Sequence, residues 1–89
     1  MRIDYSPYFL KILHRIPTHI QKAFEKRVAL FVSDRHHPLL QVHQLHGELR
    51  GFYSINVTGD WRALYRELGD ESIEWVEFLH IGTHSQLYG

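Results

Sequence analysis

The chain has 89 residues, of which 44% are hydrophobic and 22% charged, and its ten Lys and Arg side chains balance ten Asp and Glu side chains. This length allows one domain with a single core. The absence of cysteine excludes disulfides, thiolate metal sites and cysteine nucleophiles. No apolar run approaches the roughly 20 residues of a membrane span, and the N-terminus lacks a signal-peptide pattern, so we expect a cytoplasmic protein.

Charge is unevenly distributed along the chain. Residues 1–50 contain eight Lys and Arg against four Asp and Glu, a net charge of +4, whereas residues 51–89 contain two against six, a net charge of −4. Six of the eight histidines also lie in the first half, where their protonation would add positive charge. The chain is therefore polarised, although its neutral total gives no overall signature of a nucleic-acid binder.

Residues 1–5 are predicted to form a short strand with Ile3 and Tyr5 on one side. Ser6 and Pro7 follow as an N-cap and a first helical residue. The helix that they start has an apolar stripe at spacings of three and four, formed by Phe9, Ile12, Leu13 and Ile16.

Pro17 is predicted to close this helix and to open a second one. Apolar residues recur there at steps of four, four and three, at Ile20, Phe24, Val28 and Phe31. The second helix is predicted to end near Asp34, because Pro38 disfavours helical backbone just before it. The two helices would form a short hairpin.

After Pro38 the hydrophobic period changes from about 3.6 to 2. The alternation predicts a strand over residues 53–57, a turn at 58–60 and a second strand over 61–68. A third strand over 72–81 completes a three-stranded antiparallel meander. Helices that precede a sheet predict a two-layer α+β fold, with the helical hairpin packed on one face of a mainly antiparallel, twisted sheet.

The last predicted strand leads into Gly82-Thr83-His84. We expect this to place the histidine on a loop, where functional groups are common. Tyr88 adds an aromatic hydroxyl four residues later. The alternative interpretation is a polar tail that happens to contain a histidine.

Histidines also cluster at His36, His37, His43 and His46. The last two have the spacing of a metal half-site, but the sequence offers no cysteine and no predicted helix to complete it. The sequence therefore favours a polar loop over a metal site.

Arg62 and Arg66 lie on the same side of their predicted strand. Guanidinium groups match phosphate oxygens in geometry and charge, so the two arginines would form a phosphate-binding pair on an uncovered sheet face. An ion pair with Glu74 or Glu77 is the alternative.

Asp60 in the predicted turn and Trp61 just after it each have a structural and a functional interpretation. Asp60 is a common turn former and also a candidate catalytic carboxylate. Trp61 would pack against the core or stack on a nucleobase.

In their order and spacing, several short motifs resemble the RelE/ParE superfamily of bacterial toxins, most closely its YafQ-like mRNA interferases of type II toxin–antitoxin systems. The motifs are His-Gln-Leu-His-Gly at 43–47, Gly-Phe-Tyr-Ser-Ile-Asn-Val at 51–57, Gly-Asp-Trp-Arg-Ala-Leu-Tyr at 59–65, and Ile-Gly-Thr-His at 81–84 with Tyr88. The resemblance covers the whole chain. It implies one toxin domain over residues 1–89, with two helices against a mainly antiparallel sheet.

The resemblance also implies catalytic residues. His84 matches the family's catalytic histidine, and Tyr88 matches its C-terminal aromatic residue. His43 matches the histidine before the Leu-x-Gly turn, and Asp60 matches the carboxylate of the Asp-Trp turn. Arg62 matches the arginine of an Arg-x-x-Tyr strand.

Other positions are expected to contact RNA. Asn56 stands where the YafQ-like branch has another catalytic histidine, and His80 stands where an arginine commonly binds the scissile phosphate. His46, Arg50 and Trp61 complete this set of expected RNA contacts.

The implied activity is ribosome-dependent cleavage of translated mRNA by acid–base catalysis, without a metal or other cofactor. His84 and His43 would act as acid and base, in an order that the sequence leaves open. Asp60 would orient an imidazole, Arg62 would stabilise the developing charge, and Tyr88 would position the nucleotide.

The implied partners are a cognate antitoxin in a hetero-oligomer, the ribosome and mRNA, all in the bacterial cytoplasm. Three alternatives remain open at this stage. One is a ParE-like inhibitor of DNA gyrase, which shares the fold without cleaving RNA. The others are a toxin that has lost its chemistry and binds only its antitoxin, and a histidine-rich metal-binding domain.

Overall fold

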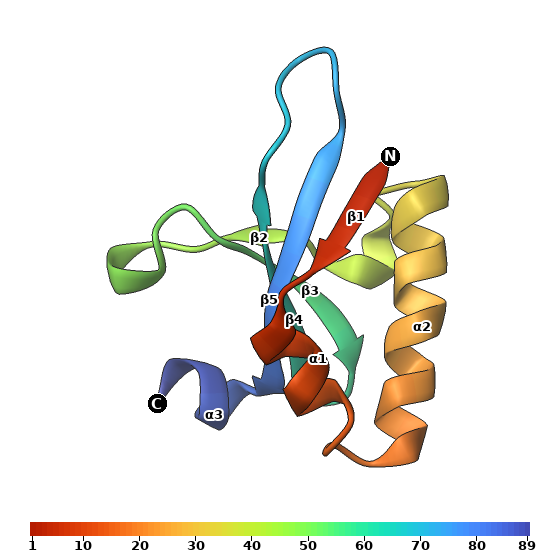
Figure 1. The fold of residues 1–89 in the computed structure, drawn as a ribbon. Coiled ribbons are helices and arrows are strands. Elements are labelled where there is room, and N and C mark those ends of the chain that lie inside the picture. Colours follow the sequence, from red (N-terminus) through yellow and green to blue (C-terminus); the bar gives the residue numbers. More distant parts are fainter.

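The computed structural model describes residues 1–89 as a two-layer α+β fold (Figure 1). One layer is a five-stranded sheet in the order β1-β5-β4-β3-β2. The strands are Arg2–Tyr5 (β1), His43–Gln44 (β2), Tyr53–Thr58 (β3), Trp61–Glu67 (β4) and Trp75–Thr83 (β5). The other layer holds helices Pro7–Leu13 (α1) and Thr18–Ser33 (α2), and a short helix, His84–Tyr88 (α3), follows β5. This confirms the predicted fold class.

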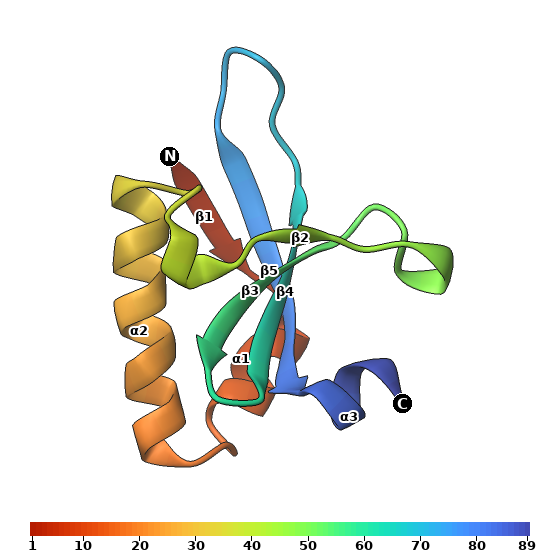
Figure 2. The ribbon, with the colours of Figure 1, turned by 180° about the vertical axis from the view of Figure 1, so that it is seen from behind.

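The predicted antiparallel meander is present as β3, β4 and β5. Both edges of this meander carry a further strand. β1 pairs with β5 in parallel, with Ile3 opposite Val76. β2 pairs with β3 in antiparallel fashion at the other edge (Figure 2). His43 lies opposite Ser54 in this pair. Single turns of 3-10 helix flank β2, at Pro38–Leu40 (η1) and Gly47–Leu49 (η2). None of the helices has the length and apolar character needed to cross a membrane.

Aromatic side chains fill the core between the helices and one face of the sheet. Phe78 lies at the centre, with its ring centroid 5.8 Å from Phe9, 5.3 Å from Phe24, 6.0 Å from Phe31 and 5.6 Å from Tyr65. All five rings are at most 2% exposed. Because side chains alternate along a strand, the residues between these core positions point to the opposite face of the sheet.

The first helix ends earlier than the sequence predicts. α1 stops at Leu13, whereas the apolar stripe continues to Ile16. Pro17 disfavours helical backbone at the residue before it, and the chain leaves the helix through a tighter turn in which the Arg15 N–H donates to the Ile12 carbonyl at 2.8 Å. Ile16 still packs against the core.

The last strand begins at Trp75, where the sequence predicts a start at residue 72. The Asp70 carboxylate accepts hydrogen bonds from the Ser72 hydroxyl at 2.7 Å, the Ser72 N–H at 2.9 Å and the Ile73 N–H at 3.2 Å. These bonds hold the segment in a turn. Led by the one from the Ser72 hydroxyl, they also hold the pKa of Asp70 below its usual value of 3.8.

Ionised Asp70 therefore stabilises the folded state above pH 3.8, and this stability is lost as the pH falls through the lower pKa of the folded state. We expect Asp70→Asn to lower the free energy of unfolding at pH 6 and to have a smaller effect at pH 2.5, as measured by urea unfolding. Glu71→Gln, at the exposed neighbouring residue, is the control. An Asp70→Asn effect of equal size at both pH values would contradict this account.

Candidate active site

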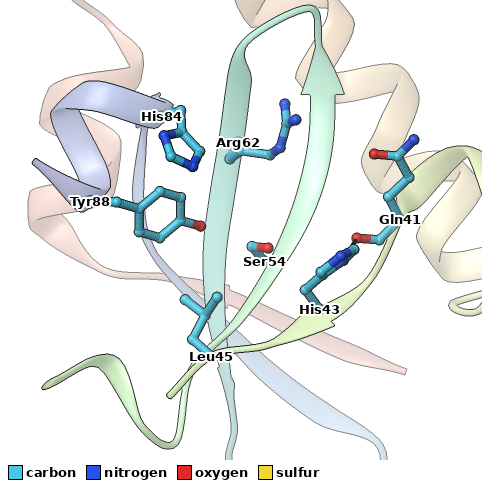
Figure 3. Close-up of a pocket in the computed structure, with 7 residues that line it drawn as sticks. All are labelled: Gln41, His43, Leu45, Ser54, Arg62, His84 and Tyr88. Carbon is cyan, nitrogen blue, oxygen red and sulfur yellow. Dashed lines mark hydrogen bonds between the residues drawn. The ribbon is translucent and has the colours of Figure 1, made fainter. Parts of the chain in front are cut away.

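A pocket of about 410 Å³ opens on the sheet face opposite the helical layer (Figure 3). Two strands supply its base: Ser54 of β3 is 5% exposed, and Arg62 of β4 is half-buried. Their neighbours Ile55 and Ala63 are fully buried in the core, so alternation directs Ser54 and Arg62 to the other face. The whole lining consists of Gln41, His43, Leu45, Ser54, Arg62, His84 and Tyr88.

Helix α3 brings His84 and Tyr88 to one wall of the pocket. The sequence predicts a loop here, but Thr83 and Gln86 form a capping box: the Gln86 N–H donates to Thr83 Oγ1 at 3.3 Å, and the Thr83 N–H donates to Gln86 Oε1 at 2.9 Å. Residues four apart share a face of a helix. The rings of His84 and Tyr88 accordingly meet edge to face, with centroids 4.7 Å apart.

Gly82, just before the capping box, leaves room at the end of β5 for the Gln86 side chain. A Cβ added at Gly82 would lie 3.0 Å from Gln86 Oε1 and 3.3 Å from Gln86 Cβ. A larger residue would therefore press on the Gln86 side chain, which caps α3.

Arg62 reaches the pocket without an acidic partner. Its Nη1 donates to the carbonyls of Gly59 at 2.9 Å and Trp61 at 3.0 Å. Across the sheet it lies opposite Asn56 on β3 and Gly82 on β5, neither of which is charged. Its Nε and Nη2 make no hydrogen bond to the protein, so one edge of the guanidinium is available to an anion.

Arg66 is held differently. It lies opposite Glu77 on β5, and its Nη2 is 2.8 Å from Glu77 Oε1. Of the two interpretations of the arginine pair, the ion pair therefore holds for Arg66, while Arg62 alone reaches the pocket.

His43 stands on the opposite wall, on β2. Its Nδ1 lies 2.6 Å from the Gln41 carbonyl oxygen. A carbonyl oxygen only accepts hydrogen bonds, so Nδ1 must carry the proton, and in the neutral ring Nε2 keeps its lone pair. The imidazole is thus arranged to accept a proton at Nε2.

The pocket contains no carboxylate. Its polar lining includes one guanidinium and two imidazoles, and no Asp or Glu belongs to it. An anion placed here would meet the Arg62 charge and the imidazoles of His43 and His84 without acidic repulsion. The pocket is therefore suited to a phosphate group next to two imidazoles, whose ring nitrogens can donate or accept protons.

Asp60, a predicted catalytic residue, lies in the turn between β3 and β4, outside the lining. Its backbone carbonyl accepts a hydrogen bond from the His84 N–H at 3.1 Å. Its carboxylate is exposed and makes no hydrogen bond to the protein. Asp60 therefore positions His84 through its backbone in this structure.

The five expected RNA contacts also lie outside the lining. Asn56 lies directly across the sheet from Arg62. His46 and Arg50 are exposed on either side of η2. Trp61 and His80 line a separate cavity of about 500 Å³ beside α1, where the His80 ring packs edge-on against Tyr8 at 5.4 Å.

The histidines at residues 36–46 do not converge. The Nδ1 of His37 accepts a hydrogen bond from the Leu39 N–H at 3.1 Å and caps η1. No group of three or more His, Asp or Glu side chains is placed to hold a metal ion.

Three lining residues were not among the predicted site residues. Ser54 could have been found, because it alternates with Ile55 in a strand whose other face is apolar. Leu45 lies within the motif at 43–47, but its side chain has no polar or ionisable group that would mark it as a site residue. Gln41 could not have been found, because its place in the site depends on its backbone conformation.

A sequence profile described as "ParE toxin of type II toxin-antitoxin system, parDE" matches residues 3–88. The chain belongs to this family. The resemblance to the RelE/ParE superfamily is thereby confirmed, and the protein is a toxin of the type II toxin–antitoxin class. A comparison with curated protein sequences finds no significant match.

Solved toxins share the fold of this ParE-family chain. YafQ from Escherichia coli BL21(DE3) has a TM-score of 0.78 and 22% identity, with 100% of both chains covered. The toxin–antitoxin complex RelBE2 from Mycobacterium tuberculosis has a TM-score of 0.65 and 26% identity, with 93% of this chain and 96% of that chain covered. The YoeB–YefM toxin–antitoxin complex from Staphylococcus aureus has a TM-score of 0.70 and 15% identity, with 94% and 97% covered.

Proposed function

We propose that this ParE-family toxin is a ribosome-dependent endoribonuclease that cleaves translated mRNA and so inhibits translation. The observation that carries the proposal is the composition of the pocket, which Arg62, His43 and His84 line together and which contains no carboxylate. RNA cleavage needs a base, a cation at the phosphate and an acid, and these three side chains can supply them. The resemblance to YafQ-like interferases supports mRNA in the ribosomal A site as the substrate.

His43 is the base in this mechanism, because its Nδ1 proton is engaged by the Gln41 carbonyl and Nε2 can accept. Nε2 takes the proton of the RNA 2′-hydroxyl as the 2′-oxygen attacks the adjacent phosphorus. The bond from phosphorus to the 5′-oxygen breaks, and His84 as imidazolium protonates the leaving oxygen. The products are a 2′,3′-cyclic phosphate and a 5′-hydroxyl. Each proton transfer of this kind typically contributes about 10² to 10⁴ in rate.

The other polar groups bind and orient the RNA. Nε and Nη2 of Arg62 face the phosphate oxygens, where negative charge builds up in the transition state. Tyr88 stacks on a base beside His84, a recognition mode that suits single-stranded RNA. Ser54 offers a hydroxyl at the base of the pocket.

The proposed partners are a cognate antitoxin, the ribosome and mRNA, and the proposed location is the bacterial cytoplasm. Related toxins have been solved in complex with their antitoxins. The net charge of +4 over residues 1–50 supports an antitoxin with an acidic segment that covers this half in a hetero-oligomer.

Membership of the ParE family favours inhibition of DNA gyrase as a second candidate function. Expression in bacteria separates the two. We expect induction of the chain to arrest growth and to produce new 5′ ends in a translated reporter mRNA, and a copy without a start codon to stay intact. Arrest with intact mRNA and gyrase-dependent DNA breaks would support the second candidate. Absence of arrest would indicate a toxin that has lost its chemistry.

A further inference from the structure

Gln41 has an unusual backbone conformation. With φ 45° and ψ 52° it is left-handed, and it is the only non-glycine residue in the structure with positive φ. Its Cβ makes this conformation unfavourable. Strained backbone of this kind persists where the surrounding structure imposes it. Residues with such backbone are common at functional sites. Gln41 fits this description, because it lines the candidate pocket.

The residues on both sides of Gln41 fix its conformation. Leu40 is fully buried, and Val42 packs against the core. The Gln41 N–H donates to the Pro38 carbonyl at 3.2 Å, which closes η1. The Gln41 side chain is exposed and makes no hydrogen bond to the protein. The left-handed backbone of Gln41 therefore sets the path of the main chain and the direction of the Gln41 carbonyl.

That carbonyl accepts the 2.6 Å hydrogen bond from Nδ1 of His43 (Figure 3). The bond selects the tautomer that carries its proton on Nδ1. Free histidine favours the other tautomer, in which Nε2 holds the proton and cannot act as a base. The direction of one backbone carbonyl thus decides whether His43 has a lone pair at Nε2.

We propose that Gln41 is a positioning residue for His43, and that its left-handed backbone fixes the Nδ1–H tautomer and ring orientation needed for proton abstraction. The catalytic part of this inference rests on the proposed function, in which His43 is the base. The tautomer part can be measured whether or not the protein cleaves RNA.

Three variants separate the backbone of Gln41 from its side chain. Gln41→Gly and Gln41→Asn remove or shorten the side chain and retain access to the left-handed region. Gln41→Val disfavours that region, because valine is branched at Cβ. Gln44→Val makes the same chemical change at an exposed strand residue next to His43 and is the matched control.

The first measurement is a long-range ¹H–¹⁵N correlation spectrum of the imidazoles at pH 8. We expect His43 to be protonated on Nδ1 in the wild type and in Gln41→Gly, Gln41→Asn and Gln44→Val, and to shift toward Nε2 protonation in Gln41→Val. An Nε2–H tautomer in the wild type would overturn the inference, even if Gln41→Val failed to fold. So would an unchanged spectrum in a folded Gln41→Val.

The second measurement is the single-turnover rate of mRNA cleavage on programmed ribosomes. We expect Gln41→Val to lose about 10-fold to 100-fold, as a misplaced catalytic group does, and Gln41→Gly and Gln41→Asn to stay within about 3-fold of the wild type. Equal losses in Gln41→Gly and Gln41→Val would show that the side chain matters and would overturn the inference. A wild type without cleavage but with the Nδ1–H tautomer would contradict the proposed function and leave the structural part confirmed.

Discussion

His84→Ala is expected to lower the single-turnover rate of mRNA cleavage by about 10² to 10⁴, the typical contribution of one general acid or base. The variant removes the group that protonates the leaving 5′-oxygen and leaves Arg62 and His43 in place. Because His84 is exposed at the start of α3, its loss opens no cavity in the core, and the thermal midpoint of unfolding should hardly change. The rate is measured on ribosomes programmed with a labelled mRNA.

His19→Ala is the matched control, since His19 is an exposed histidine near the start of α2, outside the pocket. It should cleave at the wild-type rate. If His84→Ala kept the wild-type rate while remaining folded, His84 would have no part in proton transfer and the proposed mechanism would fail.

Arg62→Ala is expected to lower the same rate by about 10² to 10³, as removal of one preorganised donor at a developing negative charge does. Arg62→Lys should recover only part of this loss, because an ammonium restores the charge but not the two-pronged geometry. Parallel assays of these two variants, under single-turnover conditions, measure both effects.

Arg66→Ala provides the comparison within the same strand. Its guanidinium is engaged by Glu77, so cleavage should be unaffected, and loss of an exposed ion pair should cost at most about 1 kcal/mol of stability. Equal rate losses in the Arg62 and Arg66 variants would indicate a diffuse electrostatic effect and would contradict a specific phosphate contact at Arg62.

Much of the fold could be predicted because hydrophobic periodicity reports which face of an element is buried. The steps of four and three in α2 and the alternation in β3 placed Phe24, Phe31, Ile55 and Val57 in the core, as the structure confirms. The sequence periodicity does not predict helix α3, although Thr83-x-x-Gln86 has the spacing of a capping box. Five residues are too few for a periodic signal, so the capping pair was the only available indication.

The site was only partly predictable, because its electrostatics depend on strand register. Arg62 and Arg66 look equivalent in the sequence, yet Arg62 lies opposite Gly82 and Arg66 lies opposite Glu77. A shift in register within β4 and β5, between Leu64 and Tyr65, sets these pairings. No periodicity in the sequence reports such a shift, and it decides which arginine is free to bind phosphate.

In the proposed reaction, His43 takes a proton from the RNA 2′-hydroxyl and His84 gives a proton to the leaving 5′-oxygen. The chemical ends of the cleaved RNA report this reaction, and they are analysed with purified protein, programmed ribosomes and labelled mRNA. We expect a 2′,3′-cyclic phosphate on the upstream fragment and a 5′-hydroxyl on the downstream fragment, and both products to form about 10² to 10⁴ times more slowly with His84→Ala. Intact mRNA after prolonged incubation with folded wild-type protein, or fragments that carry a 5′-phosphate, would contradict the account.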